Sequence, residues 1–369
     1  MLIILLRIAA FLFGGAIVIY TFLSAVRTFV MPRASNTTLT RIVFRAMNLL
    51  FQLRLRKAAT YEARDHGMAL YAPLTLLVLP GVWVAAILVG YMFMYWALQP
   101  RPIYDVFSLS GSSLLTLGFT KSEGFPSLFL EFSEAGLGLI MIALLIAYLP
   151  TMYSAFSRRE TMVAMLEVRA GTPPSPQELL TRAQRIRGLD VLTELWEQWE
   201  VWFVEVEESH TSLAALIFFR SPQPNLSWIT AAGVILDTAA LLASTVDVPN
   251  NPQAQLMLRA GYLALRRIAD YFSIDYEPNP TPDDFISISQ DEYNLVYDQL
   301  VEGGVPVKAD REAAWRAFRG WRVNYDRVLL ALAALTMAPY TQWVSDRSLP
   351  RGTMFRRGSR KNDINGVGK

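Results

Sequence analysis

The sequence has no cysteine and only two histidines in 369 residues. The absence of cysteine excludes disulfide bonds and thiolate chemistry, although it does not fix the cellular compartment. His66 and His210 leave little material for a histidine-based metal or catalytic site. We therefore expect no metal ion, no other cofactor and no enzymatic activity.

Signatures of the common nucleotide-binding domains are lacking as well. No GxGxxG motif follows a strand-like segment, and there is no run of short strands. The formal net charge is only +2, which gives no reason to expect a nucleic acid as partner. Apolar residues, in contrast, are abundant: 53% are hydrophobic, 18% are charged, and the mean hydropathy is +0.28. With little strand alternation, this balance predicts an all-α membrane protein with an additional soluble part.

Three segments reach the length of about 20 apolar residues that a transmembrane helix needs. We expect spans at residues 1–26, 69–98 and 130–157, of which the first contains a single charge, Arg7. A cleaved signal peptide is the alternative for the first segment, but its start lacks positive charge and no clean cleavage site follows. Arginines crowd the loop between the first two spans and are rare between the last two. This distribution predicts a multi-pass protein of the cell membrane with its N-terminus outside and its C-terminal domain in the cytoplasm.

The linker at residues 27–68 is basic. Within it, "TLTRIVFRAMNLLFQLRLRK" alternates apolar and basic residues at helical spacing. The pattern predicts either a helix on the inner leaflet or a cytosolic helix packed on its own protein. In the first case, residues 41–57 contact membrane lipids, anionic ones among them.

Beyond residue 160 the sequence is soluble in character. Proline-rich breaks such as "GTPPSPQ" and "EPNPTPDD" separate helical stretches. We expect an all-α cytosolic domain at residues 161–346 and a disordered basic tail at 347–369. The uncharged segment 328–345 is either a fourth span or a buried core helix, and its interruption at Pro339 favours the core helix.

Two features of this domain admit a ligand-binding interpretation. Trp196, Trp199 and Trp202 recur every three residues, which predicts a packed helix seam in preference to an aromatic ligand cage. The adjoining acidic stretch, together with His210, would bind a divalent ion only if its side chains converged, which spacing does not establish; its members are Glu205, Glu207 and Glu208.

Between the second and third spans lies "SLSGSSLLTLGFTKSEGF", residues 107–124. Its first part, with Ser112 and Ser113, predicts a helix of about three turns. The next residues, "TLGFT", are expected to be extended. A helix that ends inside a membrane protein directs its partly negative carboxyl end at the next segment of the chain, and this negative potential suits a cation. A row of backbone carbonyls from the extended piece would replace the water shell of that cation.

This arrangement resembles the pore-loop potassium channels over residues 69–160. The filter of that family reads Thr, an apolar residue, Gly, Tyr or Phe, Gly, Asp. The corresponding residues of this sequence, of which the first four match, are Thr116, Leu117, Gly118, Phe119, Thr120 and Lys121. The resemblance implies a pore helix and filter at residues 104–121 and permeant monovalent ions, potassium above all. It also implies a homotetrameric pore-loop channel domain, because one loop per chain cannot enclose a pore.

The last two filter positions depart from the family pattern. Thr120 stands in place of the second glycine, and a non-glycine residue held left-handed costs about 1–2 kcal/mol. We therefore expect Thr120 to turn its carbonyl away and to weaken the outermost ion site. Lys121, with Glu123 nearby, would form a cationic ring at the outer mouth. Both departures predict weakened selectivity.

The third span carries the candidate gate. Its candidate residues are glycines that give flexibility or allow close packing, a proline that kinks the helix, and residues that line a cavity or constriction: Gly136, Gly138, Tyr148, Leu149, Pro150 and Tyr153. Glu131 and Glu134 stand before this region. Acidic groups near a membrane face protein or water, so we expect them to pair with Lys121 or with the pore helix.

Taken together, these features predict an ion channel of the potassium-channel superfamily, with the helical cytosolic domain as the element that assembles or gates it. The alternative is a non-conducting membrane-anchored sensor or scaffold with a vestigial pore, for which Thr120 and Lys121 are the best support. A hydrolase is disfavoured, because Ser112 and Ser113 have no histidine on their side of the membrane.

Overall fold

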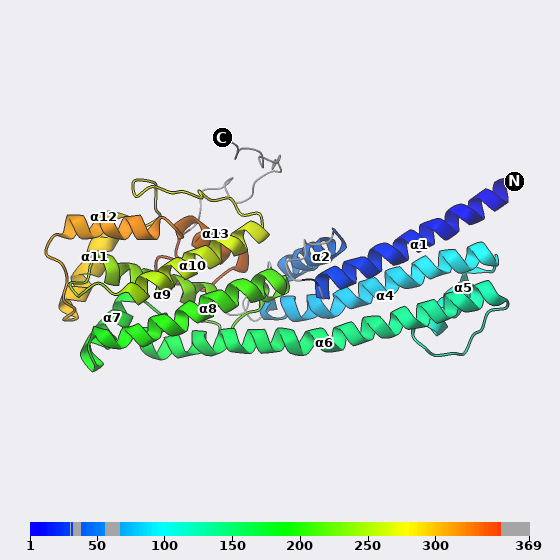
Figure 1. Ribbon diagram of the computed structural model, residues 1–369, viewed down its shortest axis with the longest axis horizontal. Coiled ribbons are helices and arrows are strands. Elements are labelled where there is room, and N and C mark those ends of the chain that lie inside the picture. The colour runs from blue at the N-terminus through cyan, green and yellow to red at the C-terminus, as the bar shows by residue number, and fades with distance from the viewer. Residues whose placement is uncertain (30, 32–37, 56–66, 348–369) are drawn as a thin grey trace, which may run out of the picture. The chain divides into compact units, whose positions relative to one another are not determined.

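The computed structural model describes residues 1–29, 31, 38–55 and 67–347 (Figure 1). In these residues the regular elements are helices, with no strand beyond isolated bridge residues such as the pair Val246 and Val307, which confirms the all-α prediction. The predicted tail from residue 348 on, and residues 30, 32–37 and 56–66 of the predicted linker, lie outside the described residues. The elements are α1 Leu2–Phe29, α2 Thr38–Leu55, α4 Tyr71–Leu98, α5 Ile103–Leu114, α6 Phe125–Ala170, α7 Pro176–Ile186, η1 Leu189–Val191, α8 Leu192–Ser212, η2 Ala214–Phe218, α9 Trp228–Ser244, α10 Pro252–Tyr271, α11 Gln290–Glu302, α12 Arg311–Arg322 and α13 Asp326–Thr336.

The chain divides into two compact units. Unit 1 consists of Met1–Phe156 and Ser212–Phe219, and unit 2 of Ser157–Thr211 and Arg220–Lys369. Helix α6 contributes residues to both units. Each unit has its own core, and the two are described separately.

Three helices of the described chain are long and apolar enough to cross a membrane: α1, α4 with its preceding turn from Gly67, and α6. Helix α6 continues through Pro150 and past the predicted end at residue 157. The residues beyond this point are mostly good helix formers, with neither glycine nor proline before Gly171, so leaving the apolar stretch does not end the helix. Gly171, with φ of +82°, comes after the last turn and ends it.

Helices α1 and α4 pack closely where two glycines face each other. A Cβ atom on Gly14 would lie 2.4 Å from the carbonyl oxygen of Gly90, so the helices approach to backbone contact. Arg7, near the start of α1, also holds this pair of helices together. Arg7 donates from Nε to the carbonyl oxygen of Ala97 at 2.6 Å and from its guanidinium to that of Leu98, which are unpaired carbonyls at the end of α4.

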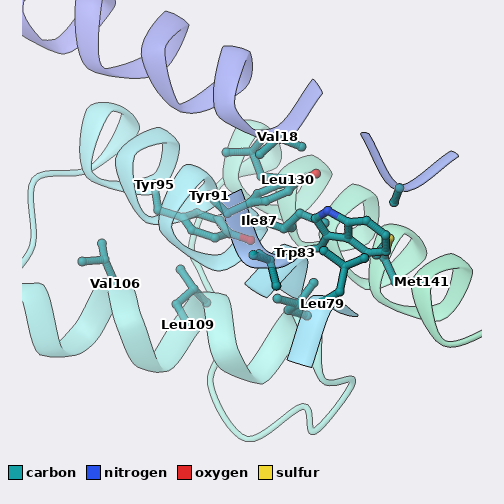
Figure 2. Close-up of a cluster of buried hydrophobic side chains, with 13 residues drawn as sticks. Val18, Leu79, Trp83, Ile87, Tyr91, Tyr95, Val106, Leu109, Leu130 and Met141 are labelled. Atoms are coloured by element: carbon teal, nitrogen blue, oxygen red, sulfur yellow. The ribbon is translucent and has the colours of Figure 1, made fainter. Parts of the chain in front are cut away.

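The core of unit 1 joins α4, α5 and α6 (Figure 2). Val106 and Leu109 of α5 point toward Tyr91 and Tyr95 of α4, and α6 adds Leu130 to the same cluster. The spacing of the two α5 residues puts them on one face of the short helix. Burial of this face holds α5 between the two long helices.

Unit 2 is built around α9, which is buried along almost its whole length. The tryptophan series of α8 belongs to this packing: Trp199 and Trp202 lie with ring centroids 4.6 Å apart, and all three are buried. The uncharged segment 328–345 forms part of the same core. Helix α13 ends at Thr336, and its C-cap residue Met337 has the left-handed conformation. Trp343 and Val344, which follow outside the helix, are also buried.

Candidate functional site

Helix α5 positions the candidate site. Pro102 precedes its first turn, where a missing N–H costs nothing, and Asp105 in that turn complements the positive end of the helix dipole. The helix spans twelve residues, which agrees with the predicted three turns. Its buried face includes Ser112, whereas Ser113 is half-buried.

The carboxyl end of α5 is closed by the segment that the sequence marks as a filter. Thr116 has a φ of +56° and lies in the left-handed region. Its N–H donates to the carbonyl of Ser113 at 3.0 Å, and the N–H of Leu117 donates to that of Ser112 at 2.8 Å. This pair of bonds is the Schellman motif, in which glycine is the usual left-handed residue. A threonine there is strained, and such strain gathers at functional positions.

Three amides of the segment turn toward the same residue. The N–H groups of Leu117 and Gly118 donate to the carbonyl of Ser112, at 2.8 and 3.4 Å, and the N–H of Thr120 donates to its Oγ at 3.2 Å. In a planar trans peptide, the carbonyl of the preceding residue points opposite to the N–H. The carbonyls of Thr116, Leu117 and Phe119 therefore point away from α5.

The sequence predicted an extended segment, and the observed segment is not extended. Left-handed torsions occur at Thr116 and at Gly118, with φ of +70°, and their alternation with ordinary residues keeps the three carbonyls on one side. Thr120 has no positive φ. Its amide is held by Ser112, in line with the expectation that it avoids the left-handed conformation.

Two side chains tether the chain after the filter segment. Gln99 donates from Nε2 to the carbonyl of Glu123 at 2.6 Å, and Glu131 accepts from the N–H of Ser122 at 2.5 Å. Glu131 thus contacts the backbone next to Lys121 instead of the lysine side chain. Lys121 and Glu123 are exposed.

Glu134 is the carboxylate of this region that lies wholly inside the unit, with 0% of its surface exposed. Tyr95 of α4 donates its hydroxyl to Oε2 at 2.9 Å, and Ser110 of α5 lies 2.5 Å from Oε1. Glu134 therefore bonds the pore-helix candidate, as expected. Sequence reasoning missed Tyr95 and Ser110, whose only signal was a position near a carboxylate at membrane depth.

The candidate gate residues are not brought together by the described chain. Tyr148 is buried and packs against Phe29, with ring centroids 4.3 Å apart. Leu149, Pro150 and Tyr153 are exposed. The two glycines differ sharply: a Cβ on Gly138 would lie 2.1 Å from the carbonyl oxygen of Leu114, whereas one on Gly136 would meet nothing within 4 Å.

This difference between the glycines gives a matched pair of substitutions. Gly138→Ala forces α6 away from the end of α5, because the obstructing atom is backbone, and overpacking of this kind costs about 1–3 kcal/mol. Gly136→Ala meets no such atom, and alanine favours the helix by up to about 1 kcal/mol. We expect the first variant to melt at a lower temperature in detergent and the second to melt like the wild type or above it. Equal melting temperatures would show that Gly138 does not set the spacing of α5 and α6.

In unit 2, the residues that suggested an ion or ligand site have other roles. His210 is buried; its Nδ1 lies 2.8 Å from the carbonyl oxygen of Val206 and its Nε2 lies 3.2 Å from the guanidinium of Arg159. Burial and the Arg159 charge hold the pKa of His210 well below its usual value. Glu207 pairs with Arg267 at 2.7 Å. In the part of the chain that the structure describes, no group of three metal-binding side chains converges.

No family model matches this chain, and no curated protein and no solved structure is significantly similar to it. The site therefore has to be interpreted from its geometry. It presents a short helix between two helices of spanning length, and a row of carbonyl oxygens at the carboxyl end of that short helix. Oxygen ligands of this kind, near the negative end of a helix dipole, suit a cation.

Proposed function

We propose that this chain is a subunit of a homotetrameric pore-loop channel of the cell membrane that conducts monovalent cations, with potassium as the preferred ion. The observation that carries the proposal is the row of carbonyls of Thr116, Leu117 and Phe119. Such a row replaces the hydration shell of a cation. The helices of spanning length on either side support a re-entrant loop that protein surrounds.

The tetramer is inferred from the number of loops. One loop supplies one wall of a pore. The resemblance to the pore-loop channels implies four copies around a common axis, whose head-to-tail contacts form a closed ring around the pore. The arginine-rich linker supports an N-terminus outside and a cytoplasmic unit 2. In this arrangement α6 lines the pore and continues into unit 2, which makes unit 2 the natural assembly or gating element.

Selectivity is the property that the two departures from the family filter affect. In the proposed pore, Thr120 does not adopt the left-handed backbone conformation, so its carbonyl does not join the row, and Lys121 adds a positive charge at the mouth. Replacing both, Thr120→Gly with Lys121→Asp, should raise the preference for potassium over sodium roughly tenfold, because glycine adopts the left-handed conformation at position 120 without the cost of about 1–2 kcal/mol that keeps threonine out of it. The measurement is the reversal potential under sodium and potassium gradients. Identical values for wild type and double variant would contradict this role of the two residues.

The proposal as a whole is tested with the purified full-length protein in liposomes. Potassium flux from particles with four-fold symmetry is the expected result. A monomer or dimer in mild detergent, without four-fold particles, would refute the tetramer. Four-fold particles without flux in either the wild type or the double variant would favour the non-conducting sensor or scaffold, for which the exposed Lys121 is the supporting observation.

A further inference from the structure

Helix α2, Thr38–Leu55, has three distinct faces. The first face packs inside unit 1. Its members, which recur at intervals of three and four residues, are Thr40, Val43, Phe44, Met47 and Phe51. Tyr71 of α4 donates its hydroxyl to the carbonyl of Phe44 at 3.2 Å, and the rings of Phe51 and Tyr71 lie 5.8 Å apart.

The second face is apolar and remains exposed. The exposed fractions are 56% for Ile42 and 59% for each of Leu49, Leu50 and Leu53. Together with Ala46, these residues form a continuous helical stripe, which we call the apolar stripe. A stripe of large aliphatic side chains on a helix that is already packed on its opposite face requires a second apolar environment.

The third face is polar and basic. It consists of Arg41, Arg45, Asn48 and Gln52, each about one turn from the next, and we call it the arginine stripe. The amide of Gln52 donates to Oδ1 of Asn48 at 3.2 Å. Helix α2 contains no acidic residue at all, so its whole field is positive. A basic face beside an apolar face is the pattern of helices that lie in a membrane interface.

The place of α2 in the fold matches this pattern. Its first turn contacts the last turn of α1, where the hydroxyls of Thr28 and Thr40 are 3.1 Å apart. Its middle contacts Tyr71, in the first turn of α4. The last turn of α1 and the first turn of α4 therefore both contact α2. Helix α2 lies at one edge of the apolar layer that the two long helices define. Lipid headgroups occupy that level of a bilayer.

We propose that α2 is a lipid-binding surface, with the apolar stripe among acyl chains and the arginine stripe on the headgroups of anionic phospholipids. A second copy of the chain fits this surface less well, because two such helices would bring like charges together. The interaction does not depend on conduction: a chain that spans the membrane without forming a pore would bind lipid in the same way.

Because the chain has no cysteine, one introduced cysteine labels one position of the full-length protein. Leu49→Cys reports the apolar stripe and Gln52→Cys the arginine stripe, each with a polarity-sensitive fluorophore. In phosphatidylcholine vesicles, brominated acyl chains should strongly quench the label on Leu49→Cys. Iodide in the aqueous phase should quench the label on Gln52→Cys. Equal iodide quenching of both labels would overturn the proposal, and disulfide cross-linking between unlabelled Leu49→Cys residues of two copies, which requires direct contact, would assign the stripe to an interface between copies.

The anionic part is tested by adding phosphatidylglycerol with a headgroup acceptor and measuring energy transfer from the Leu49→Cys label. Local enrichment of this lipid should fall about fivefold for each of Arg41→Gln and Arg45→Gln, the usual contribution of one basic side chain at an anionic surface. Arg185→Gln on α7 makes the same charge change on an exposed residue elsewhere and should leave the enrichment unchanged. The headgroup assignment would be overturned if the lipid enrichment were the same in Arg41→Gln and Arg45→Gln as in the wild type. It would also be overturned if Arg185→Gln lowered the enrichment by the same factor.

Discussion

Arg322→Met should lower the apparent melting temperature of unit 2 by about 10 °C or more, the largest stability effect expected among the substitutions proposed for this protein. Arg322 is fully buried at the end of α12 and forms two bonds, of 2.6 and 2.7 Å, with the carboxylate of Asp237. It also bonds Asp326 at 2.7 Å. Burial lowers the pKa of Arg322, but the charges of Asp237 and Asp326 outweigh burial and raise it above its usual range. Removing the guanidinium leaves the Asp237 carboxylate buried without a partner charge, which costs about 3–5 kcal/mol.

The melting of the full-length protein in detergent, followed by tryptophan fluorescence, measures this effect. Arg316→Met on the same helix is the control, because Arg316 is exposed and donates to the carbonyl of Glu312 over a long distance of 3.4 Å. The double variant Asp237→Leu with Arg322→Met should recover part of the loss, since replacing a buried pair by apolar residues is often neutral. A double variant as unstable as Arg322→Met alone would show that Asp326 and the carbonyl of Trp343, which Arg322 also bonds, carry the effect.

This ion pair could not be found from the sequence. Asp237 stands alone in the apolar run of α9, and Arg322 lies 85 residues further on. A lone carboxylate in an apolar helix predicts a partner, but nothing in the sequence says which arginine among many it is. Arg7 gave the same difficulty in unit 1, because the carbonyls that it caps lie about ninety residues away, at the end of α4.

The helices themselves were largely predictable. Length and apolar composition located α1, α4 and α6, because a helix of spanning length needs only local information. Helix α6 extends beyond the predicted span, because charge alone does not stop a helix and no glycine or proline lies between Arg158 and Ala170. The tryptophans of α8 were correctly predicted as a packed seam by their spacing.

At the site, the short helix was predictable and the path of the filter segment was not. The sequence predicted that Thr120 avoids the left-handed conformation, as it does, but it did not predict left-handed strain elsewhere in the segment. The structure has it at Thr116, because α5 ends there and the Schellman bonds to Ser112 and Ser113 impose the conformation. Which amide closes a helix end depends on where the last turn stops, and sequence patterns locate that point only to within one or two residues.

Glu134→Ala should disrupt unit 1 far more than Glu134→Gln. The alanine variant leaves the buried hydroxyl of Tyr95 without its acceptor and opens a cavity between α4, α5 and α6, at a combined cost of about 3 kcal/mol. The glutamine variant keeps the shape and an acceptor oxygen for Tyr95. The partners of Glu134 are hydroxyl groups, and Ser110 has one proton for two acceptors: the carbonyl of Leu88 at 3.1 Å and Glu134 at 2.5 Å.

That proton count is satisfied if Glu134 is the neutral acid, which donates to Ser110 while Ser110 donates to Leu88. The amide of Glu134→Gln reproduces this pattern with its N–H, so we expect a wild-type melting temperature and, in the proposed channel, wild-type flux. Glu134→Ala should melt about 10 °C lower and lose flux, because α5 then loses its anchor on α6. Glu123→Ala, which removes an exposed carboxylate nearby, is the control for stability and should not change the melting temperature. A glutamine variant as damaged as the alanine variant would show instead that Glu134 is a charged acceptor of both hydroxyl protons.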